Sequence, residues 1–240
     1  MILLLLLGKL VNILARRKVV FVIVEGVSDD TALSKILSNI FDKNVVHVCI
    51  MHCDITTERG VNPSNIVAKI GNIVRDYAKS NHFKNTDFQE IIHITDTDGA
   101  YISADNVVND DLAKKPIYNL TQIRTANVKN IIERNKQKSD NIDKLVSYNE
   151  IWKIPYKIYY MSCNLDHVLY NKLNTSDKEK EQNAFVFAKK YKDNIKGFLN
   201  YISQSDFSVV TEYKDSWLYI KQDVNSLQRH TNLGICFKNI

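Results

Sequence analysis

The chain has 240 residues, of which 45% are hydrophobic and 25% are charged. This balance excludes the disordered, collagen-like and membrane-embedded classes and is typical of a globular protein with a core of its own. The net charge of +5 permits a polyanionic partner without requiring one. Four cysteines show no paired framework, so we expect reduced thiols and a cytoplasmic protein.

The first residues, MILLLLLGKLVNILARRK, are strongly apolar. A membrane-spanning helix needs about 20 apolar residues, and Lys9 interrupts the run after Leu7. A signal peptide would have a basic segment before the run and small residues at a cleavage site after it. We therefore expect an amphipathic helix that packs on the protein or on a second copy of the chain, without membrane attachment.

Two short apolar runs that stop at acidic residues predict neighbouring buried strands. They are KVVFVIVEGVSDD at residues 18–30 and EIIHITDTDGA at residues 90–100. Runs rich in Val and Ile and too short for a helix are typical of strands buried on both faces of a parallel sheet. The acids at the ends of the two runs are Glu25, Asp29, Asp96 and Asp98.

Strands and helices alternate along this part of the chain. After the first strand, Ser28 can cap a helix whose first turn carries Asp29, where a negative charge is favourable on helix-end grounds alone. A β-α-β-α-β order then calls for a parallel sheet with right-handed connections. The further elements expected are a strand at 44–51, a helix at 63–82, a strand at 90–95, a strand at 156–162 and a helix that follows it through 173. The fold class is therefore α/β, with a Rossmann-like parallel sheet flanked by helices.

The remaining segments are less regular. Residues 101–155 read as a helical insertion over the strand ends, with a helix near 125–138. Towards the C-terminus we expect one long helix over 178–203. Trp217 and Tyr219 alternate with polar residues, which predicts a half-buried strand.

The acids at the strand ends predict a metal site. Ligand sites of open α/β sheets lie just beyond the carboxyl ends of the strands, so the four carboxylates would converge there and need cations between them. Oxygen ligands without Cys or His suit Mg²⁺ or Mn²⁺. Gly99 would ease a turn that lets Asp96 and Asp98 reach one ion, while Glu25 can act as a ligand or as a general acid or base.

V-E-G-x-S-D at residues 24–29 and D-T-D-G at residues 96–99 resemble the glutamate and D-x-D motifs of the Toprim fold. This metal-binding domain is shared by topoisomerases, bacterial primases, OLD-family nucleases and small ribosomal-RNA-maturing ribonucleases. The resemblance covers roughly residues 18–173. It implies a Toprim domain over 1–173, with the N-terminal helix and the insertion, and a mostly helical C-terminal extension over 174–240 packed on it.

The resemblance also implies roles for individual residues. Glu25, Asp96 and Asp98 match the catalytic acids, and Asp29 matches a further acid of the glutamate motif. In OLD-type nucleases a strand that ends in Ser is followed by an acid that helps to hold a second metal. Ser162 and Asp166 resemble that arrangement, although an acid in a first helical turn is also good capping.

A metal-dependent nuclease acting on DNA or RNA is the function that the resemblance implies. Topoisomerases and primases need further domains, for which 240 residues leave little room. Small stand-alone Toprim proteins often act as nuclease effectors in anti-phage (antiviral) defence, paired with an ATPase sensor. No Walker A loop, G-x-x-x-x-G-K-[ST], occurs in the sequence, so ATP sensing would come from a separate chain.

Two cations near the C-terminus are candidates for nucleic-acid binding. Lys221 and Arg229 could face a phosphate backbone, for which a guanidinium is well suited.

Three alternatives stay open. A ribosomal-RNA-maturing ribonuclease would share Glu25, Asp96 and Asp98. A non-catalytic binding or assembly module would use the acids to hold structural Mg²⁺. A receptor-like domain of a phosphorylation relay would need a lysine at the end of a later strand, whereas Lys157 begins one.

Overall fold

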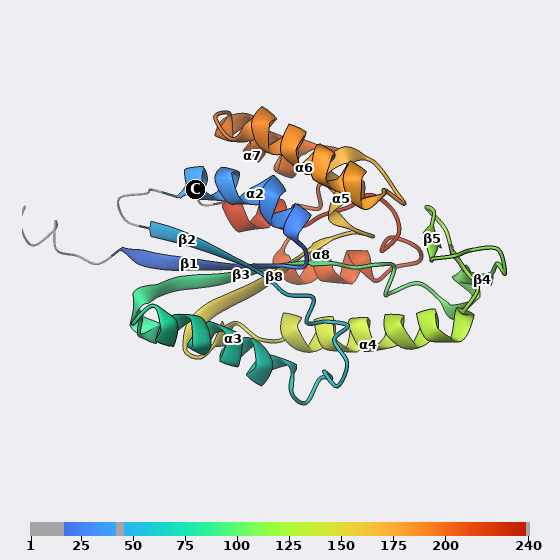
Figure 1. Cartoon of the computed structure of the whole chain (residues 1–240), viewed down its shortest axis with the longest axis horizontal. Coiled ribbons are helices and arrows are strands. Elements are labelled where there is room, and N and C mark those ends of the chain that lie inside the picture. Colours follow the sequence, from blue (N-terminus) through green and yellow to red (C-terminus); the bar gives the residue numbers. More distant parts are fainter. Residues whose placement is uncertain (1–16, 42–45, 239–240) are drawn as a thin grey trace, which may run out of the picture.

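The structure is a computed structural model that describes residues 17–41 and 46–238. A five-stranded sheet lies between two layers of helices (Figure 1), with the strands in the order β2-β1-β3-β8-β7. Its strands are β1 (Lys18–Val24), β2 (Val46–His52), β3 (Phe88–Asp96), β7 (Glu150–Ile151) and β8 (Ile154–Met161). All neighbours are parallel except β7, which runs antiparallel to β8. The helix expected at the N-terminus falls outside the described residues.

Helices cover both faces of the sheet because both faces of its strands are apolar. In β1, Val20 and Val22 pack with one helical layer, while Phe21 and Ile23 pack with the other, and all four are fully buried. The first layer holds α2 (Val27–Ile40), α5 (Leu165–Tyr170), α6 (Asp177–Tyr191) and α7 (Ile195–Gln204). The second holds α3 (Ile66–Ser80), α4 (Val128–Val146) and α8 (Tyr213–Ile220). The predicted α/β class, a mostly parallel sheet flanked by helices, is confirmed.

The chain reverses its direction across the sheet between β1 and β3. The chain leaves β1 through α2 on one face, and it leaves β3 through α4 on the opposite face (Figure 1). Open α/β sheets bind their ligands at such a switch point, beyond the carboxyl ends of the two strands. The acids that follow β1 and β3 lie there.

The segment between β3 and α4 differs from the predicted helical insertion. It forms a small three-stranded sheet of order β4-β6-β5 beyond the strand ends of the main sheet (Figure 1). Its strands are β4 (Val107–Asn109), β5 (Ile117–Tyr118) and β6 (Ile123–Thr125), and a short 3-10 turn at Ala104–Asn106 precedes β4. Another 3-10 turn, Asn85–Asp87, lies before β3. The helix expected near 125–138 is α4, which is longer because its later residues Ile142 and Leu145 pack on the main sheet. It thus serves as the crossover between β3 and β8.

Two predictions for the C-terminal part are wrong. The single helix over 178–203 is two helices, α6 and α7, because Asn194 accepts a hydrogen bond from the Gly197 amide and begins a new helix. The strand at Trp217 and Tyr219 is the helix α8, followed later by a 3-10 helix at Leu233–Phe237. In α8 the buried residues Trp217 and Ile220 lie three apart, a helical spacing.

One further helix also ends earlier than predicted. The helix after β8 ends at Tyr170, before 173, because Asn171 takes a left-handed conformation with φ of 55°. In the part of the chain that the structure describes, no helix combines the length and apolarity needed to cross a membrane.

A substitution at Gly99 tests the packing around the turn after β3. Its φ is +69°, and a β-carbon there would lie 2.6 Å from Leu227 Cδ2. We expect Gly99→Ala to lower the free energy of unfolding by about 2 kcal/mol or more, from backbone strain and steric overlap together. Gly60→Ala is the matched control, since Gly60 has φ of +81° with nothing within 4 Å. It should lose only about 1 kcal/mol in urea unfolding. Equal losses would contradict tight packing at Gly99.

Candidate functional site

The ends of β1 and β3 bring Glu25 onto the D-T-D-G turn, as the sequence predicts. Glu25 Oε1 accepts hydrogen bonds from Thr95 Oγ1 at 2.6 Å and from the Asp96 backbone amide at 3.1 Å. The two motifs are therefore in direct contact. Strand pairing enforces this contact, because β1 and β3 are in register up to Ile23 and His93.

A lysine that sequence reasoning did not identify lies between the acids. Lys138, from α4, places its Nζ atom 3.2 Å from both carboxylate oxygens of Glu25 and 2.5 Å from Asp98 Oδ2. Its side chain is fully buried. Burial disfavours the charged ammonium, but Asp98 and Glu25 outweigh that effect and raise the pKa of Lys138 above its usual value. A protonated amine thus occupies the point on which the two carboxylates converge.

Two further residues of α4 hold the turn that carries Asp98. Asp98 itself has a left-handed backbone with φ of 48°. Its carbonyl oxygen accepts a hydrogen bond from Arg134 Nη2 at 2.8 Å, and Asn135 Nδ2 donates to the Gly99 carbonyl at 3.2 Å. Burial raises the pKa of Asp98, but Lys138 and Arg134 together hold that pKa below its usual value. Asp98 is therefore ionised and oriented by α4.

The remaining acids lie on the α2 and α5 side of the turn. Asp96 Oδ1 accepts a hydrogen bond from the Leu165 amide at 3.0 Å, at the start of α5. In the same first turn of that helix, Asp166 Oδ2 accepts one from Thr175 Oγ1 at 3.0 Å. Asp29 Oδ2 accepts one from the Gly26 amide at 2.9 Å. Both acids are buried, with 9% exposure for Asp29 and 6% for Asp166.

The expected capping residue of α2 is wrong. Gly26, rather than Ser28, precedes the first helical residue, and no side chain caps the helix there. Ser162 also has a structural contact, because it is fully buried and its Oγ donates to the Asn225 carbonyl at 2.7 Å. Burial raises the pKa of Asp29, and Asp166 lies close enough for its charge to raise that pKa further.

The site holds more carboxyl groups than Lys138 can neutralise. Burial, more than any neighbouring charge, raises the pKa of Glu25 to about 7 and that of Asp29 to about 6. Burial also raises the pKa of Asp96 well above its usual value, with help from the charges of Glu25 and Asp29. Carboxylates that resist ionisation in this way gain from a bound cation.

The chemistry of the ligand atoms suits a hard divalent metal ion. The acids at the site offer oxygen ligands alone, which suit Mg²⁺ or Mn²⁺. As the side chains stand, no three acids, histidines or cysteines of residues 17–41 and 46–238 are grouped closely enough to hold one ion together. The ammonium of Lys138 fills the point between Glu25 and Asp98. A metal ion at that point would compete with the lysine.

Lys221 and Arg229, predicted to bind nucleic acid, both contact protein groups in the structure. The Nε and Nη2 atoms of Arg229 donate to the Val168 carbonyl at 2.9 and 2.7 Å, and the guanidinium lies 4.1 Å from the centre of the Phe207 ring. Lys221 pairs with Asp143 Oδ1 at 2.7 Å. Their role in nucleic-acid binding stays a prediction.

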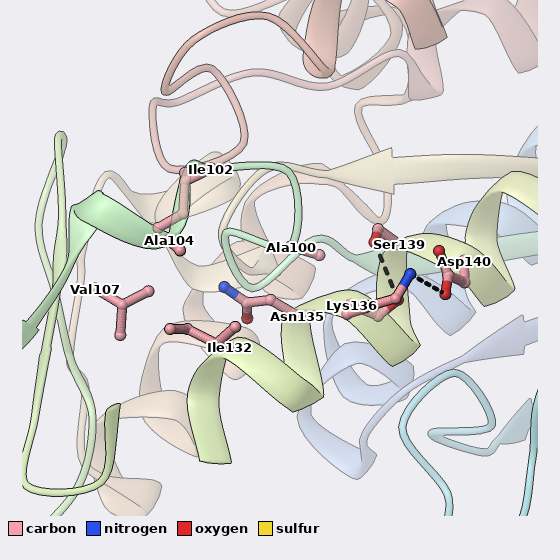
Figure 2. A pocket seen from close by; sticks show the side chains of 9 residues that line it. All are labelled: Ala100, Ile102, Ala104, Val107, Ile132, Asn135, Lys136, Ser139 and Asp140. Carbon is pink, nitrogen blue, oxygen red and sulfur yellow. Dashed lines mark hydrogen bonds and ion pairs between the residues drawn. The ribbon is translucent and has the colours of Figure 1, made fainter. Parts of the chain in front are cut away.

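A pocket of about 220 Å³ borders the same turn on another side of α4 (Figure 2). Its polar side chains contact protein groups. Lys136 pairs with Asp140 at 2.9 Å, and Ser139 Oγ donates to the Lys136 carbonyl. The pocket is lined by Ala100, Ile102, Ala104, Val107, Ile132, Asn135, Lys136, Ser139 and Asp140.

Comparison with known proteins adds no relative. No model of a protein family matches the sequence, and searches of curated proteins and of solved structures find no similar protein.

Removing the buried ammonium tests the charge balance of the site. In EDTA, Lys138→Met should lower the free energy of unfolding by about 3–5 kcal/mol, because it leaves Glu25 and Asp98 without their partner. Mg²⁺ should then raise the melting temperature of the variant more than that of the wild type, since the ion can take the vacated place. Lys136→Met is the control, because its exposed pair with Asp140 contributes less than about 1 kcal/mol. If Mg²⁺ raised the melting temperatures of the wild type and Lys138→Met equally, the ion would not compete with the Lys138 ammonium.

The stability of the metal-free protein should depend on pH. The pKa of Glu25 is raised from 4.5 to about 7, so the folded state binds more protons than the unfolded state between those values. Stability in EDTA should therefore fall as the pH rises through this window, by up to about 3 kcal/mol. The urea midpoint against pH measures this. Glu25→Gln should flatten the profile, and a stability that increases from pH 5 to 7 would show that the sign is wrong.

Proposed function

We propose that this chain is a metal-dependent nuclease of Toprim type that hydrolyses phosphodiester bonds of DNA or RNA. The observation that carries the proposal is the contact of Glu25 with the D-T-D-G turn at the β1/β3 switch point. The strand-end position, the order of the two motifs and the excess of buried carboxyl groups over cations all support it. Buried carboxylates cost free energy unless they are paired, so a cluster with more acids than its one lysine can pair points to a use beyond stability.

The acids have distinct roles in this proposal. Asp96 and Asp98 would hold Mg²⁺ or Mn²⁺ together with Glu25, and Asp29 and Asp166 would supply ligands on the α2 and α5 side. A bound metal lowers the pKa of water and stabilises charge on the phosphoryl oxygens.

Two groups of the chain contribute further chemistry. Glu25, with a pKa of about 7, can exchange a proton at neutral pH. Lys138 keeps a positive charge beside the two carboxylates, where negative charge would develop on a substrate phosphate.

The resemblance to small stand-alone Toprim proteins suggests a biological setting. We propose an anti-phage defence effector in the cytoplasm that works with a separate ATPase sensor, because the sequence has no Walker A loop. A ribosomal-RNA-maturing ribonuclease would use the same acids and differ in substrate alone.

A receptor-like domain of a phosphorylation relay is the second candidate. The observation in its favour is Lys138, which supplies the lysine beside strand-end acids that Lys157 does not. The β2-β1-β3-β8 strand order is also that of flavodoxin-like sheets. Such a domain would take up phosphate from acetyl phosphate, and Asp96→Asn or Asp98→Asn would abolish the uptake. A nuclease would not retain a phosphoryl group.

A cleavage assay tests the proposed function. The substrates are supercoiled DNA, single-stranded DNA, transfer RNA and ribosomal RNA, in Mg²⁺, Mn²⁺ or EDTA. We expect cutting only in the presence of Mg²⁺ or Mn²⁺, and a cleavage rate at least about 100-fold lower in Glu25→Ala and in Asp96→Asn. Glu133→Gln, an exposed acid of α4 paired with Lys129, is the control and should cut at the wild-type rate. Cutting in EDTA, or full activity in both acid variants, would refute the proposal.

A negative result has a defined reading as well. If the wild type cuts none of the substrates, calorimetric titration with Mg²⁺ decides between the remaining candidates. Binding that Asp96→Asn abolishes would mean that the metal site is real and that a partner or trigger for cutting is missing. The absence of any binding would show that the site is not a metal site.

A further inference from the structure

A second pocket, of about 310 Å³, lies beside the acidic site between the small sheet and the start of α6. Two of its lining residues contact the acidic site directly. Arg134 donates to the Asp98 carbonyl, and Thr175 donates to the carboxylate of Asp166. A group bound in this pocket would therefore lie next to the acids on both sides of the turn.

The charge of this pocket is positive. Lys115, Arg134 and Lys180 line it, and none of its described lining residues is acidic. The ammonium groups of Lys115 and Lys180 form no ion pair or hydrogen bond with another residue that the structure describes. The pocket of Figure 2 differs in this respect, because its lysine, Lys136, is paired with Asp140.

The wall of the pocket is held in place by hydrogen bonds between separate segments. Asn174 accepts a hydrogen bond from the Tyr118 amide and donates to the Tyr118 carbonyl, both at 2.8 Å. The Tyr118 hydroxyl in turn accepts one from Arg134 Nη1 at 2.5 Å. The small sheet, α4 and the loop before α6 are thus joined around the pocket that Lys115 and Lys180 line.

We propose that this pocket binds a phosphate group of the nucleic acid, adjacent to the phosphate that is cut. The inference rests on the proposed function. A nucleic acid that approaches the acidic site is repelled by the carboxylates unless nearby cations offset them. Lysine ammonium groups beside a fixed guanidinium are a common arrangement for phosphate recognition.

The other cationic candidates are weaker. The pocket between α2 and α6 is lined by Asp177 and Glu181 as well as by Lys180, so its charge is mixed. The pocket at Arg229 contains Asp206, and the Arg229 guanidinium already donates a hydrogen bond to the Val168 carbonyl.

Binding of short oligonucleotides tests the inference without catalysis. We would measure the fluorescence anisotropy of 3′-labelled 12-nucleotide DNA and RNA, with a 5′-hydroxyl or a 5′-phosphate, in EDTA and again in Ca²⁺. The Lys115→Ala/Lys180→Ala double variant should bind at least about 10-fold more weakly than the wild type. Its slope of log affinity against log salt should be smaller by about 1–2.

A matched control separates the pocket from general surface charge. Lys189→Ala/Lys196→Ala removes two exposed lysines that do not line the pocket and should change affinity less than about 2-fold. Lys180→Arg, which keeps the charge, should bind as the wild type does. The melting temperature of each variant establishes that it is folded.

Each outcome bears on the inference. If the 5′-phosphate increases affinity and the pocket variant loses that increase, the pocket binds a terminal phosphate. If both oligonucleotides bind equally and both weaken in the variant, it binds an internal phosphate. Equal weakening in the pocket and control variants, unchanged binding in the pocket variant, or no binding by the wild type in either condition would overturn the inference.

The test is independent of the proposed function. Binding is measured without cleavage. A protein that cuts no substrate but whose affinity depends on Lys115 and Lys180 would therefore support the phosphate pocket and refute the nuclease. A protein that cuts in a metal-dependent way but whose affinity does not depend on the two lysines would support the nuclease and refute the phosphate pocket.

Discussion

A buried ammonium among buried carboxylates is the interaction on which the arrangement of this protein depends. Ionised groups in a protein interior are costly unless they are paired, and Lys138 pairs with acids from the ends of both β1 and β3. The helix that carries it is anchored by Ile142 and Leu145 against the sheet. One helix therefore fixes two strand ends, and the turn at Asp98 takes its shape from the same helix through Arg134.

The acids of the site could be predicted from the sequence, whereas the lysine was missed. Parallel strands end at one edge of a sheet, so Glu25 and Asp96 had to meet if the two runs were neighbouring strands. Lys138 reaches the site through the docking of a helix, which no local pattern fixes. Its position carried a signal all the same, because Ile131, Lys138, Ile142 and Leu145 form a buried stripe at helical spacing. A lysine in such a stripe needs a buried acid as a partner.

The errors in element type have a similar origin. Trp217 and Tyr219 alternate with polar residues over too few positions to separate period two from a helical period. In the structure the buried pair is Trp217 and Ile220, and Leu218 is exposed. The break between α6 and α7 depends on one capping asparagine, Asn194, whose contribution is small beside that of a long apolar stripe. Tertiary packing decided the first case and a single side chain the second.

Charge placement says more about this protein than its total charge does. A net charge of +5 is compatible with many functions, but the chain places carboxylates at the strand ends and free lysines in the neighbouring pocket. An acidic site alone would repel a nucleic acid, and a basic pocket alone would bind one without reacting. Arg134 contacts both regions, because it lines the pocket and donates to the Asp98 carbonyl. In the proposed function, a phosphate held there would lie at a defined position relative to the carboxylates, as the cutting of a neighbouring bond would require.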